Sequence, residues 1–260
     1  MISDAMLTQE YFDTMNSLDG DLAGKRSARA YMDQSSAIVH HRVVGASFIP
    51  RLYNDEVWER FRFISETIHT ILCKVIERYR NDESYRMVFD YDPRLVELIL
   101  LPRGYDAILP FARADIFLNE DTLESAFCEL NGDGSAGLNE DREIVHSIEG
   151  SETVTRFAAH HQLESCELFK SWVSEFIAIY ETFKNKVAHP RFAICDYLDV
   201  GVVDEFRIFS EYFKQAGYEC VIADVRDLSF DGTALRDGNG QQIDAIWRRC
   251  VTNDVLEHWD

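Results

Sequence analysis

The stretch ARADIFLNEDTLESAFCELNGDGSAGLNEDRE, residues 112–143, contains two short β-like runs followed by a glycine-rich loop. The runs cover residues 115–118 and 125–130, and the polar segment 119–124 lies between them. Two short apolar runs separated by a turn-like segment are typical of a β-hairpin. We therefore expect a hairpin here, and it carries an unusual set of polar side chains.

These polar side chains occur in pairs two residues apart, Arg113 with Asp115 and Glu129 with Asn131. Residues two apart on a strand share a face, so a paired hairpin could gather all four on one patch. Carboxylate and amide oxygens suit Mg²⁺, and the planar arginine fork suits a phosphate oxygen. The pattern is compatible with a site for Mg²⁺, nucleotide phosphates and a carboxylate. Spacing alone equally allows a cross-strand ion pair on a solvated face.

The loop after the second run, residues 132–142, contains three glycines. Glycines leave backbone N–H groups accessible and let a ligand approach closely, although the same residues also make ordinary turns. A calcium-binding loop is excluded, because its sixth position would be Ala136 instead of glycine and its twelfth would be Arg142 instead of glutamate.

Composition limits the function further. The chain has 260 residues, 46% of them hydrophobic, and a formal net charge of −20 without a lysine- or arginine-rich run. Such a surface repels nucleic acids and anionic membranes, so neither is an expected partner. The six cysteines lie mostly in apolar runs, which predicts reduced, buried thiols. The acidic N-terminus does not resemble a signal peptide, and we expect a soluble, cytoplasmic protein.

Helical periodicity predicts long amphipathic helices over residues 52–79 and roughly 163–187, and the apolar stripe of the second is expected to be core. Residues 95–99 suggest a short helix or strand. RFAICDY, VVDEFRIFSEYFKQAG and YECVIAD then read as a β-α-β unit with parallel strands. TALRDGNGQQIDAIW reads as a further hairpin that turns at residues 237–240.

The predicted fold class is α+β, in two regions. Residues 1–188 form a helical region with the polar hairpin and the glycine loop, and residues 189–260 form a small Rossmann-like α/β unit. Arg248 and Arg249 end the last predicted strand, where ligands of α/β units commonly bind, so an anion-binding role is one possibility and ion pairing with the acidic surface is the other.

Two segments carry a resemblance to a known family. ARAD followed by CELNGDGSAG resembles the R-x-D … E-x-N pattern of glutathionylspermidine synthetase and its relatives, the circularly permuted ATP-grasp carboxylate–amine ligases. The later segment GYECVIADVRDLSFDGTALRDGNGQQIDAIWRR is similar to the same family in layout. The resemblance covers residues 100–145 and 190–250, and it identifies the C-terminal region with the family's pre-ATP-grasp unit.

The resemblance implies an enzyme that activates a carboxylate with ATP and Mg²⁺ as an acyl phosphate, which an amine then attacks. Asp115, Glu129 and Asn131 match the Mg²⁺ ligands of the family. Arg113 matches the arginine that stabilises the transferring phosphoryl group. The acid is a small molecule or a peptide, and neither the identity of acid and amine nor the oligomeric state follows from the sequence.

In the same way, Asp133, Gly134 and Ser135 match the loop that contacts the acyl substrate. The family's ATP-grasp lobes come largely after the strand that ends here in Arg249, and the sequence stops at Asp260. We therefore expect an N-terminal fragment of a longer ligase, inactive by itself, with a final helix capped by Asn253. The alternative is a non-catalytic module that binds a peptide or small molecule and derives from such a ligase.

Overall fold

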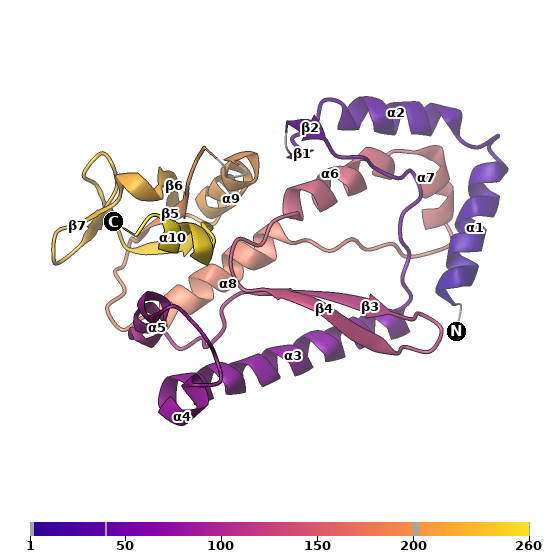
Figure 1. Cartoon of the computed structure of the whole chain (residues 1–260). Helices are drawn as coiled ribbons and strands as arrows, with labels where there is room; N and C mark the ends of the chain where they lie inside the picture. The colour runs from indigo at the N-terminus through magenta and orange to yellow at the C-terminus, as the bar shows by residue number, and fades with distance from the viewer. Residues whose placement is uncertain (1–2, 40, 200–202, 260) are drawn as a thin grey trace. The chain divides into compact units, whose positions relative to one another are not determined.

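The structure is a computed structural model that describes residues 3–39, 41–199 and 203–259, and its class is α+β, as predicted (Figure 1). The chain forms two compact units. The first consists of Met1–Phe63, Ile116–Ala126 and Ala136–Leu168. The second consists of Ile64–Asp115, Phe127–Ser135 and Phe169–Asp260. The expected boundary at residue 188 stays a prediction.

The first unit is built mainly from helices that pack in pairs. Its elements are α1 (Asp4–Asn16), α2 (Leu22–Met32), β1 (Ile38–Val39), β2 (Arg42–Val43), α6 (Leu138–Glu149) and α7 (Glu152–Ala158). Helix α1 packs against α7 and α2 against α6. The rings of Tyr11 and Phe157 meet edge to face at 5.5 Å in the core of the α1–α7 pair.

A buried carboxylate joins the start of α2 to the start of α7. Asp21 Oδ2 accepts from the Thr153 backbone N–H (3.0 Å) and from its hydroxyl (2.8 Å), while Oδ1 accepts from the Gly24 N–H (2.9 Å). Burial raises the pKa of Asp21, but the hydrogen bonds from Thr153 and Gly24 outweigh burial. The pKa of Asp21 therefore lies below its ordinary value.

This network predicts an acid-sensitive contribution to stability. A carboxylate with a lowered pKa stabilises the fold fully above its unfolded pKa, about 4, and this contribution disappears as the pH falls through the lower folded value. Thr153→Val should reduce the free energy of unfolding by roughly 1–3 kcal/mol at pH 7 and by less at pH 3, as measured by urea denaturation. Thr155→Val, which removes a bond to the Ser151 carbonyl, is the control and should show no pH dependence.

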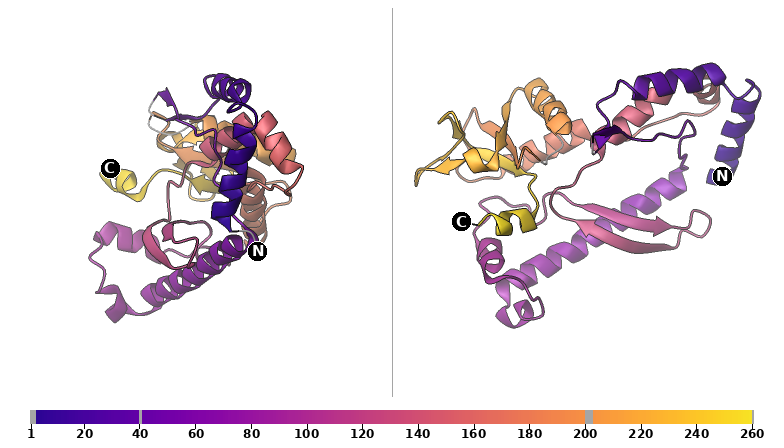
Figure 2. Two further views of the ribbon diagram at one scale, coloured as in Figure 1. Left: turned by 90° about the vertical axis from the view of Figure 1, so that its right-hand side faces the viewer. Right: turned by 45° about the horizontal axis from the view of Figure 1, so that its top comes forward.

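The predicted hairpin is confirmed as β3 (Arg113–Leu118) and β4 (Ser125–Asn131), which pair in a two-stranded sheet (Figure 2). Its turn closes through the Asn119 N–H, which donates to the Glu124 carbonyl (2.9 Å), and through the Leu123 N–H, which donates to the Asn119 carbonyl (2.7 Å). Leu123 has a φ of +59°, so a leucine occupies a left-handed position that favours glycine.

Replacing this residue should stabilise the hairpin. A residue with a side chain costs roughly 1–2 kcal/mol in the left-handed region, and glycine avoids this cost. Glycine also gives the unfolded chain more freedom, which offsets part of the gain in stability. We expect Leu123→Gly to raise the free energy of unfolding by about 0.5–1 kcal/mol in denaturant titrations. Leu123→Ala keeps the Cβ and should bring no gain; a gain as large with alanine would show that the backbone is not the cause.

The second unit contains helices around a parallel sheet. It takes up most of α3 (Asp55–Asn81), followed by α4 (Glu83–Arg86), α5 (Pro93–Leu100), α8 (Phe169–Glu181), β5 (Arg191–Asp196), α9 (Val203–Gln215), β6 (Glu219–Asp224), a 3₁₀ turn (Val225–Asp227), β7 (Ser229–Phe230), β8 (Leu235–Arg236), β9 (Gln242–Ile243), β10 (Ala245–Arg248) and α10 (Thr252–Glu257). The long helix expected over residues 52–79 is thereby confirmed as α3.

The β-α-β prediction is confirmed by the sheet, whose order is β10-β5-β6 with both pairs parallel. The central strand β5 is buried on both faces, which explains its continuous apolar sequence. Phe192 meets Phe176 of α8 (5.2 Å) and Phe213 of α9 (5.6 Å) on one face. On the other face, Ala193 and Cys195 belong to a core cluster with residues of β8 and β9.

Three sequence-based expectations need correction. The second long helix spans 169–181 instead of 163–187, because Leu163 remains 41% exposed and finds no core to pack against. The glycine loop is shorter than 132–142, since α6 begins at Leu138. All six cysteines are free as predicted, but Cys128 and Cys166 are exposed instead of buried.

The hairpin expected within residues 233–247 comprises β8 and β9, whose turn at Asp237 is closed by its side chain. The chain then continues into β10, which leaves the hairpin and pairs with β5. Among the helices of the described residues, none has both the length and the apolar character that crossing a membrane requires.

Candidate functional site

The four polar side chains of the hairpin meet, as the sequence suggests. Arg113 Nε and Nη2 donate to the two carboxylate oxygens of Asp115 at 2.9 and 3.4 Å. The same Nη2 lies 3.8 Å from Glu129 Oε1. Asn131 Nδ2 donates to Glu129 Oε1 at 3.1 Å. We call Arg113, Asp115, Glu129 and Asn131 the tetrad; within it, contacts run from Asp115 through Arg113 and Glu129 to Asn131.

The tetrad is open to solvent, with Arg113 46% and Glu129 58% exposed. Ion pairs at such exposure contribute about 0–1 kcal/mol to stability, so the fold gains little from holding these charges together. Two carboxylates and an amide are a donor set that fits Mg²⁺, which uses few protein ligands and keeps other positions for water or phosphate. Within the described residues, no group of three or more His, Cys, Asp or Glu side chains is placed to hold a metal.

The loop that follows the tetrad is fixed to the chain after β10. Asp133 Oδ2 accepts from the Thr252 backbone N–H (2.8 Å) and from its hydroxyl (2.6 Å). Gly134 has a φ of +56°, and a Cβ there would lie 2.7 Å from Val251 Cγ1. The expected helix is present as α10, but Asn253 is not its cap: the helix starts at Thr252, and Asp133 satisfies that N–H from the loop.

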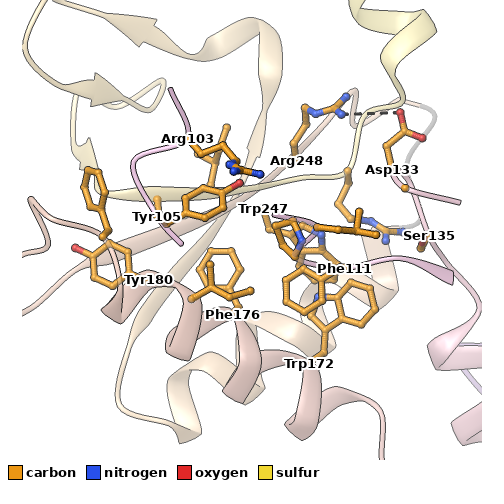
Figure 3. A pocket seen from close by; sticks show the side chains of 18 of the residues that line it. Arg103, Tyr105, Phe111, Asp133, Ser135, Trp172, Phe176, Tyr180, Trp247 and Arg248 are labelled. Atoms are coloured by element: carbon orange, nitrogen blue, oxygen red, sulfur yellow. Dashed lines mark ion pairs between the residues drawn. The ribbon is translucent and has the colours of Figure 1, made fainter. Parts of the chain in front are cut away.

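Beside this loop lies a cavity of about 560 Å³ within the second unit (Figure 3). Its walls come from residues 103–111, the glycine loop, α8 and the whole of β10. The lining residues used below are Arg103, Tyr105, Phe111, Trp172, Tyr180 and Trp247. A volume of this size with apolar walls and a few polar groups is typical of small-molecule sites.

The expected substrate and anion residues lie at this cavity. Its lining includes Asp133, Gly134, Ser135, Arg248 and Arg249. Ser135 is buried, and its hydroxyl donates to the Asn131 carbonyl (3.3 Å). The tetrad itself is not among the lining residues, so hairpin and cavity are neighbouring parts connected through Gly132. The roles assigned to these residues stay predictions.

The two arginines that end β10 differ sharply. Arg249 is buried, pairs with the fully buried Glu205 at 3.2 Å, and lies over the rings of Phe206 and Trp247. Arg248 is 42% exposed, donates to the Cys250 carbonyl (2.7 Å), and lies 3.9 Å from Asp133. Of the two, Arg248 is therefore the better placed to meet an anion.

Sequence reasoning missed several cavity residues. Arg103, Tyr105 and Phe111 belong to an irregular segment without periodicity, so no pattern marks them. Trp172 belongs to the apolar stripe expected to be core, and it both packs in the core and lines the cavity. One feature of the sequence could have marked these residues: Arg103 and Tyr105 lie on either side of a glycine in the segment PRGY.

Comparison with known proteins places the fold. The chain matches the structure of a glutathione synthetase-like effector, GSS30, from Globodera pallida in its apo form, with a TM-score of 0.58 and 12% sequence identity. The fold is glutathione synthetase-like. The match covers 91% of this chain and 59% of that one, so this chain spans less than two thirds of that structure. No family model and no curated protein matches the sequence.

The tie between Asp133 and Thr252 gives a direct prediction. Hydrogen bonds to a charged group contribute roughly 1.5–3 kcal/mol. Asp133→Asn and Thr252→Val should each destabilise the second unit, and a double-mutant cycle should give a coupling of about 1–2 kcal/mol. A cycle of Asp133→Asn with the exposed Thr233→Val is the control and should give additive effects; additivity in both cycles would contradict the tie.

Proposed function

We propose that this chain is part of an ATP- and Mg²⁺-dependent carboxylate–amine ligase of the glutathionylspermidine synthetase-like type, which forms an amide through an acyl phosphate. The observation that carries the proposal is the meeting of Arg113, Asp115, Glu129 and Asn131 on one accessible patch. The glutathione synthetase-like fold supports the proposal as well.

Each member of the tetrad has a role in this proposal. Asp115, Glu129 and the Asn131 amide oxygen would hold Mg²⁺, which would supply positive charge next to the phosphates of ATP. Arg113 would orient the transferring phosphoryl group with its fork of N–H donors and stabilise the negative charge that develops there. The glycine loop and Arg248 would position the carboxylate that receives the phosphoryl group.

The surroundings agree with such partners. An amine substrate is a cation at neutral pH, and a protein with a net charge of −20 attracts it. The acid is a small molecule or a peptide that reaches the loop at residues 132–135. We also propose a cytoplasmic location. The cytoplasm keeps thiols reduced, and the six free cysteines support this location.

A second candidate is a binding module without catalysis, and one observation favours it. Arg113 already donates to both carboxylate oxygens of Asp115, so its positive charge is neutralised within the tetrad, whereas the cavity has its own walls and three arginines of its own. A protein of this kind would retain binding after removal of the tetrad.

The two candidates separate in a hydroxylamine-trapping assay on the full-length protein. Hydroxylamine attacks an acyl phosphate to give a hydroxamate, so a ligase supplied with Mg²⁺, ATP and glutathione should produce hydroxamate and ADP together. Arg113→Ala should lower this rate about 10²-fold or more, the usual loss for a donor at developing charge.

Two controls make the result decisive. Arg207→Ala removes an arginine from an exposed ion pair on α9 and should leave the rate unchanged. Glu129→Gln should shift the Mg²⁺ titration to higher concentrations. The ligase proposal fails if Arg113→Ala retains the full rate, or if it loses stability and rate in equal measure.

A further inference from the structure

The cavity has an unusually aromatic wall. Phe111 stacks on Trp172 with ring centres 4.3 Å apart and planes 7° from parallel. Trp172 lies 5.2 Å from Trp247, and Tyr105 and Tyr180 extend the wall (Figure 3). Aromatic pairs contribute roughly 0.5–1.5 kcal/mol beyond the area they bury, so such a wall favours a ligand that is itself planar.

One wall residue has an unsatisfied polar group. The indole Nε1 of Trp172 is buried, and it has no hydrogen-bond partner within the described residues. A buried N–H without a partner costs roughly 1–3 kcal/mol, so a ligand acceptor that reached the indole would be favoured. A ligand without such an acceptor, aromatic or aliphatic, would leave this cost in place.

The charge of the cavity differs from that of the whole chain. Its lining holds three arginines, Arg103, Arg248 and Arg249, and two aspartates, Asp133 and Asp244, a local balance of +1 in a chain of −20. The other charged residue types are absent from the lining. Glu77 and Glu205, which pair with Arg103 and Arg249 from outside the lining, remove this excess, so the preference for an anion rests on Arg248.

The arginines also differ in how they are neutralised. Arg103 pairs with Glu77 at 2.9 Å and Arg249 with Glu205 at 3.2 Å. The corresponding distance for Arg248 is 3.9 Å, to an Asp133 oxygen that also accepts two hydrogen bonds from Thr252. The least neutralised positive charge of the cavity is therefore that of Arg248, next to the glycine loop.

We infer that this cavity is a binding site for a planar aromatic molecule that carries one anionic group, with the ring packed against the wall that Phe111, Trp172 and Trp247 form and the anion at Arg248. This site goes beyond the proposed ligase. It rests on the cavity alone and stands whether or not the tetrad catalyses.

Three matched probes test the inference by calorimetry on the full chain. N-acetyl-L-tryptophan has both the ring and the carboxylate, N-acetyl-L-tryptophanamide has the ring alone, and N-acetylglycine has the carboxylate alone. We expect one molecule of N-acetyl-L-tryptophan to bind, at least about 10-fold more tightly than either of the others. Equal affinity for all three, or binding of none, overturns the inference.

Variants then locate the site. Arg248→Gln should weaken N-acetyl-L-tryptophan about 10-fold, down to the affinity of the amide, and should leave the amide unchanged. Arg207→Gln, an identical charge change at an exposed residue of α9, should alter neither. Ile179→Trp, which fills the cavity, should abolish binding of both ring compounds while near-ultraviolet circular dichroism confirms the fold.

The outcomes also separate this inference from the ligase proposal. Arg113→Ala should remove hydroxamate formation but leave N-acetyl-L-tryptophan binding intact, because Arg113 does not line the cavity. Binding that survives Ile179→Trp or Arg248→Gln at full strength would show that the probe sits elsewhere and would overturn the assignment.

Discussion

The two hydrogen bonds from Thr252 to Asp133 are the constraint on which the site depends. One carboxylate oxygen accepts both the N–H and the hydroxyl of Thr252, and this joins the loop that leaves β4 to the residues that follow β10. Since β10 is fixed by parallel pairing with β5, the loop has a defined place at the edge of the sheet. Ser135 and Arg248, far apart in sequence, thereby line one cavity.

The sequence predicted those elements of the fold whose residue pattern fits only one kind of secondary structure. Strand β5 is buried on both faces, so its unbroken apolar run could be recognised, and the hairpin was recognisable from its two runs and turn. The cavity was not predictable, because its wall combines an irregular segment with one face of α8. Gly134 illustrates the same limit: its sequence context suggested ligand approach, whereas packing against Val251 already requires a glycine there.

Charge is distributed unevenly over this chain, and that distribution matters for its chemistry. The net charge is −20, yet three arginines line the cavity and a fourth belongs to the tetrad. A ligase of the proposed kind must collect an acid and an amine, which carry opposite charges at neutral pH. In such a ligase, acidic surroundings would attract the amine and local arginines would hold the acid, so the two attractions would not compete.

Within the described residues, the hairpin that bears the tetrad is a sheet of two strands, so the outer edge of each strand pairs with no further strand. Phe117 and Phe127 are 69% and 52% exposed on it. An open strand edge with exposed aromatic rings can pair with a strand of another molecule, and repeated pairing of this kind gives cross-β stacking. The tetrad, with Arg113 against Asp115 and Glu129, carries a net charge of −1, and each added layer would repeat that charge and oppose the stacking. These polar residues would thus also limit self-association of the hairpin, whether or not they take part in catalysis.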